Sequence, residues 1–297
     1  MLFQDASQSF LNYAEITHKS ATVRFYRQKI CKLMKYFRDQ HLEDINRFDI
    51  IDFIAEYRKQ NPEVSNATIN KHIQTLKVMR NVLTEKPLDM NKLKEEKKLS
   101  KIIDDKTIKK IFDYYEALDT TFEPMGLRNH LMFKLLLDTG LRINELLNLQ
   151  VKDVLMKQRT IHVKITKMSS ERYVYFTDET ADLMKRYSKR FRLKNYLFFD
   201  IFTGRPLKAS AIQSICGRLE KRLRLKDHVR PHKWRHTFAT NFLKNGGDIE
   251  SLRLILGHTN LLTTQRYLHF DNTHVQKEYE RVTGRLQDTV TNYSSPW

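Results

Sequence analysis

The sequence predicts a mainly α protein with two domains and a small β-sheet or hairpin in the second domain. Three observations lead to this fold class. Apolar residues recur at spacings of three and four along most of the 297-residue chain. Apolar and polar residues alternate convincingly, as in a half-buried strand, only around residues 161–176. Residues 86–103 are highly charged and lack a broad apolar face, which indicates an interdomain linker.

The first predicted domain, residues 1–85, is helical. Its expected helices are 5–17, 20–39, 48–58 and one that begins at Ser65. Ser20 is a candidate N-cap for the second helix, whose apolar positions form one stripe. Asn61-Pro62 separates the third helix from the fourth. The basic residues on the other faces of helix 20–39 suit a solvated surface as well as one that faces nucleic acid.

The second predicted domain, residues 104–297, begins with helices and then contains the strands. Ile108, Ile111, Phe112 and Tyr115 line the first expected helix. A second helix is expected over 127–137, and a third after the helix-ending Thr139-Gly140. Residues 161–165 and 172–176 are predicted to form a β-hairpin with Lys167 at its tip.

The composition favours an anionic partner. The chain carries 53 Lys and Arg against 35 Asp and Glu, a net charge of +18. Such a surface attracts nucleic acid phosphate, with an anionic membrane surface as the competing partner. No apolar run approaches the roughly 18 residues that span a bilayer, and the first residues do not resemble a signal peptide. Cys31 and Cys216 are predicted to be buried, reduced thiols of a cytoplasmic protein.

One short stretch concentrates basic and imidazole side chains. His232, Arg235 and His236 follow Pro231, which suits the first position of a helix. Their spacing puts them on one helix face, and their donors suit an anionic oxygen centre. A basic solvated face is the alternative. A zinc site is disfavoured, because Lys233 occupies the place of the general-base Glu in an H-E-x-x-H motif.

Four further positions indicate a function only when they are considered together. They are Arg142 after a helix-ending glycine, Lys167 in the hairpin turn, His258 in Leu256-Gly257-His258, and Tyr267. Each has an ordinary explanation on its own. Arg142 can pair with Glu145, Lys167 can be an exposed hairpin lysine, His258 can cap a helix end, and Tyr267 can be a core aromatic.

These positions belong to four stretches of the chain: Thr139-Gly140-Leu141-Arg142-Ile143-Asn144-Glu145-Leu146, His232-Lys233-Trp234-Arg235-His236-Thr237-Phe238-Ala239-Thr240, Leu256-Gly257-His258, and Tyr267. In this order and spacing, the four stretches resemble the tyrosine recombinase (phage integrase) family. The resemblance covers essentially the whole chain. Residues 1–85 look like the family's helical, DNA-clamping core-binding domain and 104–297 like its catalytic domain, with a tail helix near 275–288. The organisation is similar to Xer-type recombinases or short mobile-element integrases, with no room for an arm-binding domain before it.

The resemblance also implies roles for particular residues. Carried over by position, the catalytic residues are Arg142, Arg235, His232, His258, Tyr267 as nucleophile and Lys167. The lysine match is looser, because the family's Gly-Lys-Gly turn is replaced by Thr166-Lys167-Met168, and Lys164 is an alternative. Glu145 is expected to support Arg142 and His232. Trp234, where a leucine is common, is expected to be a core substitution, and His236 a structural residue.

The implied activity is site-specific DNA recombination through a 3′-phosphotyrosyl intermediate and a Holliday junction, without cofactor or metal. The implied partners are double-stranded DNA and three further subunits, in a homotetramer or in a heterotetramer with a related recombinase, in the cytoplasm at the nucleoid and with no membrane. The candidate DNA-binding residues are Arg24, Arg27, Lys71, Lys77, Arg172 and Lys233. The alternatives are a type IB topoisomerase-like enzyme and a non-catalytic DNA-binding relative.

Overall fold

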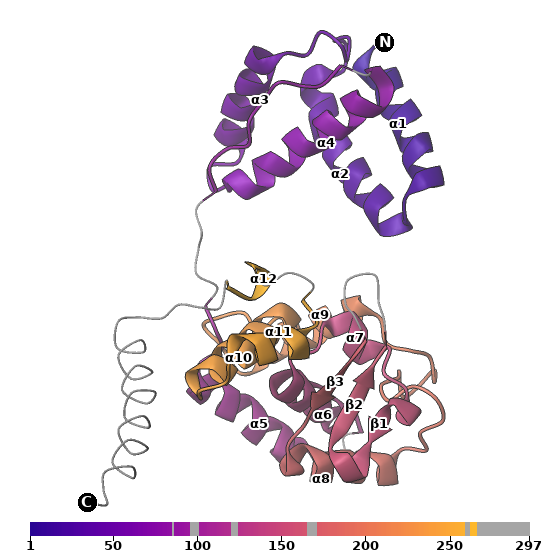
Figure 1. Ribbon diagram of the computed structural model, residues 1–297, viewed down its shortest axis with the longest axis vertical. Coiled ribbons are helices and arrows are strands. Elements are labelled where there is room, and N and C mark those ends of the chain that lie inside the picture. Colours follow the sequence, from indigo (N-terminus) through magenta and orange to yellow (C-terminus); the bar gives the residue numbers. More distant parts are fainter. Residues whose placement is uncertain (85, 96–100, 120–123, 165–170, 259–261, 266–297) are drawn as a thin grey trace, which may run out of the picture. The chain divides into compact units, whose positions relative to one another are not determined.

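A computed structural model describes residues 1–84, 86–95, 101–119, 124–164, 171–258 and 262–265. The chain divides into two compact units, Met1–Leu99 and Ser100–Trp297. Both are built mainly from helices, and the second also contains a small antiparallel sheet (Figure 1). The predicted fold class is therefore confirmed.

The first unit contains α1 (Phe3–Thr17), α2 (Ser20–Phe37), α3 (Arg47–Gln60) and α4 (Asn66–Thr84). Their apolar stripes bury one core that includes Phe10, Leu33 and Ile69. The N-cap of α2 is Lys19, so the prediction that Ser20 caps this helix is wrong. Cys31 is exposed, because it lies on α2 away from the buried stripe, and its predicted burial is also wrong.

The residues after α4 extend the first unit beyond its predicted end at residue 85. Leu88 and Met90 are buried in the core of this unit. The Asn70 side chain accepts from the backbone N–H of Leu93 at 2.8 Å and donates to its carbonyl at 2.9 Å. Part of the predicted 86–103 linker is thus an extended strap on the first unit, held by two apolar anchors and an asparagine on α4.

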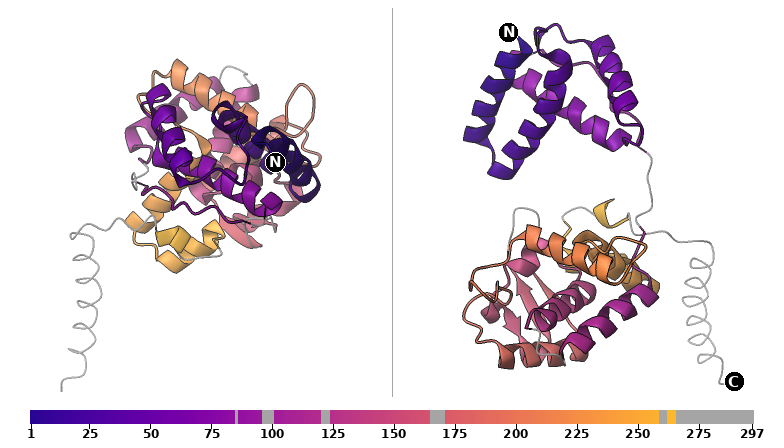
Figure 2. Two further views of the ribbon diagram at one scale, coloured as in Figure 1. Left: turned by 90° about the horizontal axis from the view of Figure 1, so that it is seen from above. Right: turned by 180° about the vertical axis from the view of Figure 1, so that it is seen from behind.

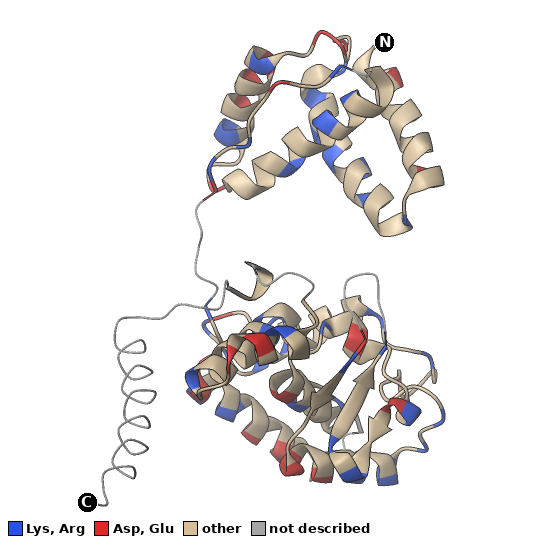
Figure 3. Ribbon diagram, in the orientation of Figure 1, with Lys and Arg blue, Asp and Glu red and all other residues tan. Residues whose placement is uncertain are grey.

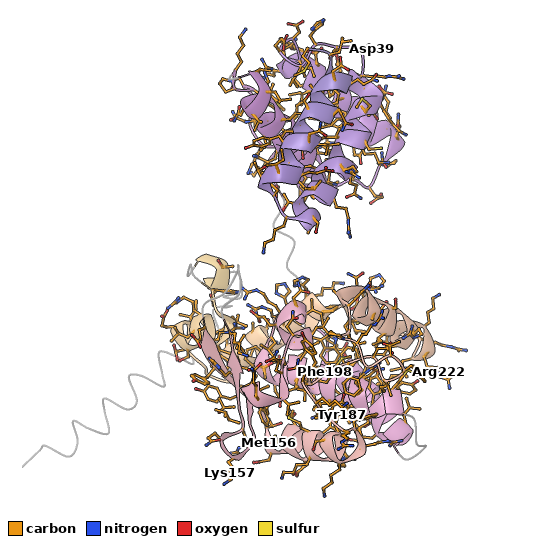
Figure 4. All side chains as sticks on the ribbon, turned by 90° about the vertical axis from the view of Figure 1, so that its right-hand side faces the viewer. Asp39, Met156, Lys157, Tyr187, Phe198 and Arg222 are labelled. Carbon is orange, nitrogen blue, oxygen red and sulfur yellow. The ribbon has the colours of Figure 1, made fainter. Side chains whose placement is uncertain are left out.

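The second unit is organised around α6 (Pro124–Thr139), whose Leu131, Phe133 and Leu135 are fully buried. This helix lies between α5 (Asp105–Asp119) on one side and the sheet on the other (Figure 1, Figure 2). The remaining helices are α7 (Ile143–Leu147), α8 (Asp178–Arg190), α9 (Ala209–Arg222), α10 (Pro231–Lys244), α11 (Ile249–Leu256) and α12 (Leu262–Gln265). Figure 4 shows Tyr187 and Phe198 within this core, where their ring centroids are 6.1 Å apart.

Trp234 has the core position that the sequence predicts for it. The residue is 0% exposed and packs against Phe112 and Phe133, with ring centroids 5.9 and 5.0 Å away. Its indole N–H donates to the Val229 carbonyl at 3.0 Å, which satisfies the one polar group of a large buried side chain. This contact joins α10 to α6 and fixes the helix that carries Arg235.

The sheet is antiparallel with strand order β1-β2-β3, and consists of β1 (Val154–Leu155), β2 (Thr160–Val163) and β3 (Arg172–Tyr175). Short 3-10 turns at Val151–Asp153 and Met156–Gln158 flank β1. In β3 the burial alternates, so that Arg172 and Val174 face the interior while Tyr173 and Tyr175 face solvent. The predicted strands are present, and β1 is an addition to the predicted hairpin.

Candidate active site

The arginine stretch begins where α6 ends. Gly140 has a φ of +61°, a left-handed conformation that glycine adopts without steric cost, and the chain turns there into α7. Arg142 precedes α7, and its backbone N–H donates to Glu145 Oε2 at 2.8 Å. Its Nη1 donates to Glu145 Oε1 at 3.0 Å. The nearly buried Glu145 carboxylate, with a side chain 2% exposed, therefore fixes both the backbone and the guanidinium of Arg142.

Arg235 enters the same region from α10. Its Nη1 donates to the carbonyl of Gly140 at 2.6 Å, and its Nη2 donates to the carbonyl of Leu256 at 2.8 Å. The residue is 5% exposed. Because a guanidinium presents its donors in a rigid fork, these two acceptors determine the plane and direction of the group.

His258 lies against Arg235 just after α11 ends. Gly257 is the C-cap residue of α11, with a φ of +63°. His258 Nε2 is 2.9 Å from Arg235 Nη2, and His258 Nδ1 is 2.9 Å from Thr264 Oγ1. Since a guanidinium can only donate, Nε2 accepts, and the ring proton resides on Nδ1 and is donated to Thr264. The two contacts therefore assign the Nδ1–H tautomer to His258.

The carbonyl of Leu256 joins the two arginines. It accepts from Arg142 Nη1 at 3.3 Å and from Arg235 Nη2 at 2.8 Å. The last carbonyls of a helix have no intrahelical partner and carry the negative end of its dipole, so they attract cationic donors. The structure thus brings Arg142, Glu145, Arg235 and His258 together, although they are spread over more than a hundred residues of sequence.

The other predicted catalytic residues stand apart from this network or outside the described residues. His232 is exposed on α10, three residues before Arg235. Lys167, Tyr267 and the predicted tail helix at 275–288 lie outside the described residues. The alternative lysine, Lys164, is bound to the buried Asp153 carboxylate at 2.7 Å, which gives it a structural partner within the sheet region.

The predicted DNA-binding residues occupy different environments. Arg24 and Lys71 are exposed, Lys77 is half-buried, and Arg27 is exposed but paired with Glu15 at 2.7 Å. Lys233 is half-buried, with its ammonium 3.8 Å from an Asp227 carboxylate oxygen. Figure 3 shows that Lys and Arg recur along α2 and α4 of the first unit.

Lys29 and Lys32 on α2 and Lys71 on α4 form a basic cluster. Partial burial and the neighbouring charges of Lys71 and Lys32 lower the pKa of Lys29 below its usual value. Positive charges held this close together repel one another, and an anion bound beside them relieves that repulsion. Lys29 and Lys32 belong to the basic faces of helix 20–39, for which the sequence left a solvated and a DNA-facing surface open. Their proximity to Lys71 could not be predicted, because it depends on how α2 packs against α4.

Arg172 was predicted to contact DNA, but its side chain is buried and pairs with groups inside the protein. The side chain is 6% exposed and pairs with Glu145, with Nη2 2.8 Å from Oε2 and Nη1 3.2 Å from Oε1. Its Nε donates to the carbonyl of Ile255 at 2.6 Å. Because β3 alternates, Arg172 shares the interior face with Val174, and its donors are directed into the protein.

Thr264 is a residue of the site that the sequence did not single out. It is 0% exposed and accepts the His258 ring proton. A threonine three residues before Tyr267 has no sequence signal of its own, since only the packing of α12 on α11 brings it to the histidine.

Two family models match the chain. The model of the phage integrase family matches residues 101–274, and the model of the phage integrase N-terminal SAM-like domain matches residues 8–87. The tyrosine recombinase XerC of Oceanobacillus iheyensis is 29% identical over 293 residues, covering 91% of this chain and 93% of that protein. The tyrosine recombinase XerA of Saccharolobus solfataricus is 40% identical over 152 residues, 51% of this chain and 49% of that protein.

Solved structures share the fold. The Tn1549 transposon integrase in complex with circular intermediate DNA has a TM-score of 0.79 and 20% identity, covering 95% of this chain and 100% of that one. The XerH site-specific recombinase bound to difH substrate, in its pre-cleavage complex, has a TM-score of 0.69 and 23% identity, covering 88% of this chain and 79% of that one.

None of the helices in the described part of the chain is long and apolar enough to cross a membrane.

Proposed function

The chain belongs to the phage integrase family and is a tyrosine-type site-specific DNA recombinase, and we propose that it cuts and rejoins double-stranded DNA with Tyr267 as the nucleophile. One observation carries the proposal. Arg142 and Arg235 converge on the carbonyl of Leu256, so two rigid forks of donors face one small region. Such a pair suits the non-bridging oxygens of one phosphate.

The reaction is a phosphoryl transfer that conserves the number of phosphoester bonds. The Tyr267 oxygen attacks the scissile phosphorus in line, a 3′-phosphotyrosyl bond forms, and the bond to the 5′-oxygen breaks. Charge then gathers on the non-bridging oxygens, where Arg142 and Arg235 stabilise it. Losing one such pre-organised donor typically slows a reaction by about 10²- to 10³-fold. Arg142→Lys should therefore be severely impaired, since an ammonium cannot reproduce the fork.

Two protons move in this step. The hydroxyl of Tyr267, with an ordinary pKa of about 10, loses its proton as it attacks, and His232 is the proposed acceptor. The leaving 5′-oxygen gains a proton, and Lys167 is the proposed donor. His258 contributes differently. As the Nδ1–H tautomer it accepts from Arg235, so it orients the guanidinium that binds the phosphate.

The first test asks whether Tyr267 forms a covalent bond to DNA. On a nicked substrate that traps the cleaved intermediate, the wild-type chain should give an SDS-resistant protein–DNA adduct. Tyr267→Phe should give none and should bind the same DNA with unchanged affinity. An adduct formed by Tyr267→Phe would refute the nucleophile assignment.

Lys167 is tested with a substrate whose 5′-bridging oxygen is replaced by sulfur. Sulfur leaves without a proton, so this substrate should restore cleavage by Lys167→Ala. Lys164→Ala serves as the matched control, because Lys164 is held by Asp153. Cleavage by Lys167→Ala that stays equally slow on both substrates would remove Lys167 as the general acid.

Recombination requires two duplexes, and the proposed assembly is a tetramer of this chain, or of this chain with a related recombinase, passing through a Holliday junction. The segment 275–288 is proposed to dock on a neighbouring subunit. A chain truncated after Thr273 that still forms tetramers on DNA would exclude that docking role. Strand exchange between two labelled duplexes separates this function from topoisomerase-like relaxation of one duplex.

The target DNA distinguishes the two biological roles that suit this activity, integration or excision of a mobile element and resolution of DNA multimers. The decisive experiment is to isolate the DNA trapped covalently on Tyr267 in cells and to sequence it. Site recognition depends on base-edge contacts, so the recovered sequences also define the recombination site.

A further inference from the structure

Arg172 stands at a junction between three parts of the site. It is the first residue of β3, and its guanidinium forms a two-point pair with Glu145, which also binds Arg142. Its Nε reaches the carbonyl of Ile255 in the last turn of α11. The next carbonyl along, that of Leu256, accepts from both Arg142 and Arg235. One arginine therefore contacts the partner of the first proposed catalytic arginine and the helix end that holds both.

We infer that Arg172 is a positioning residue for DNA cleavage, which acts by holding Glu145 and the end of α11 so that Arg142 stays directed at the scissile phosphate. This inference rests on the proposed function of Arg142. It assigns Arg172 no contact with the reacting atoms, because the guanidinium is turned into the protein and is 6% exposed.

Charge gives the first reason. A nearly buried carboxylate beside a phosphate-binding arginine repels the phosphate and competes with it for the same guanidinium. Glu145 has this position, 3.0 Å from Arg142 Nη1. Arg172 supplies a second guanidinium at 2.8 Å, which offsets the charge of Glu145. The positive charge of Arg142 is then available to the DNA.

Geometry gives the second reason. Gly257, which ends α11 immediately before His258, lies directly over Arg172. A β-carbon at Gly257 would be 3.0 Å from both Cδ and Nη1 of Arg172. This close contact between the Gly257 backbone and the Arg172 guanidinium determines how far the turn that leads into His258 lies from β3. Arg172 therefore contacts Glu145, the partner of Arg142, on one side and the Gly257 turn that leads into His258 on the other.

The test compares two scissile groups. One nicked substrate carries the normal phosphate, and the other carries an uncharged methylphosphonate, which lacks one of the charged oxygens that Arg142 would bind. Single-turnover formation of the adduct is measured for Arg172→Gln and Arg172→Lys. On the phosphate substrate we expect cleavage to slow by about 10- to 100-fold, the size expected when a catalytic group is displaced. On the methylphosphonate substrate the loss should be much smaller.

A second buried arginine provides the matched control. Arg128 is 5% exposed and donates to the Phe199 carbonyl at 3.1 Å, away from the site. Arg128→Gln should change the two cleavage rates by the same factor. An Arg172→Gln defect that is equal on the two substrates would show that Arg172 only supports the fold, and would overturn the inference.

Arg172→Gln leaves a buried carboxylate without its partner, so a second variant guards against simple misfolding. The double variant Glu145→Gln/Arg172→Gln removes both charges and should cleave the phosphate substrate faster than Arg172→Gln alone. Equal or slower cleavage by the double variant would also overturn the inference. Failure of the proposed function is recognised separately, since the wild-type chain would then form no adduct, or Tyr267→Phe would still form one.

Discussion

Alanine at Gly140 is expected to damage both the stability of the second unit and its activity. Gly140 has a φ of +61°, and a β-carbon there would lie 2.8 Å from Phe238 Cε1 and 2.9 Å from Leu256 Cδ2. Favourable carbon–carbon contacts lie at about 3.5–4.0 Å, so both side chains would have to move. The affected residues are also functional, because the carbonyls of Gly140 and Leu256 hold Arg235.

The expected cost has two parts. A non-glycine residue in the left-handed region costs about 1–2 kcal/mol. Overpacking in a filled core costs about 1–3 kcal/mol more. Gly140→Ala should therefore lower the free energy of unfolding of this unit by about 2–5 kcal/mol. Gly204 is the matched control, since its φ is +67° and nothing lies within 4 Å of an added β-carbon, so Gly204→Ala should show only the backbone cost.

Urea denaturation followed by Trp fluorescence measures the difference. The chain has two tryptophans, and a Trp297→Phe background leaves Trp234, buried in the core of the second unit, as the reporter. Cleavage of a nicked substrate is measured in parallel. If Gly140→Ala proves no more destabilising than Gly204→Ala, the crowding between α6, α10 and α11 does not restrain this turn, and the reasoning fails.

Three further outcomes are expected. Burial lowers the pKa of His72 to about 4, and below pH 6.5 the unfolded chain binds a proton that the folded unit excludes, so stability should fall between pH 6.5 and 4. Allowing for solvent screening, the loss is up to about 2 kcal/mol; hydrogen exchange of first-unit amides should detect it, and His72→Phe should abolish it. Thr264→Val leaves the His258 ring proton without its acceptor and should slow adduct formation by about tenfold, whereas Thr264→Ser should restore it; equal rates for the two variants would contradict this role. Lys71→Ala should weaken DNA binding and reduce the slope of log affinity against log salt by about one, and an unchanged slope would place Lys71 away from the phosphates.

Helix α2 was predictable because its buried residues form a single stripe. The spacing of Ile30, Leu33 and Phe37 in α2 satisfies the helical period independently of what covers it. The pair of longer strands was predictable from alternation for the same reason. Strand β1 has only two residues, Val154 and Leu155, so it contains no periodic signal, and its existence depends on pairing with β2.

The end of the first unit was misjudged for a physical reason. Residues 86–103 are highly charged, a composition that is typical of a solvated linker. Leu88 and Met90 are nevertheless buried, and the side chain of Asn70 provides hydrogen bonds that an extended strap cannot make within itself. Leu88 and Met90 are buried among apolar side chains that other helices supply, and the sequence of the segment itself does not contain those neighbours.

The sequence likewise predicted some residues of the active site and missed the role of others. Arg142, Arg235 and His258 were found because their stretches carry a strong joint pattern. Arg172 was predicted to bind DNA, although its alternation with Tyr173 and Tyr175 places it on the interior face of β3 together with Val174. Both faces of this strand carry apolar or aromatic residues, so the sequence does not indicate which face is buried. Tyr173, for example, resembles a core residue but is 51% exposed.

The last turn of α11 explains why these residues converge. If the helix continued, the carbonyls of Ile255 and Leu256 would accept from backbone N–H groups one turn later. Gly257 ends the helix in the left-handed conformation, and the two carbonyls become acceptors for arginines from other elements. Arg172 comes from β3, Arg142 from the start of α7 and Arg235 from α10, so one helix end orients three guanidiniums before DNA arrives. Pre-organisation of this kind lowers the cost of reorganising charged groups in the transition state, and it depends on the glycine stop as directly as on the arginines.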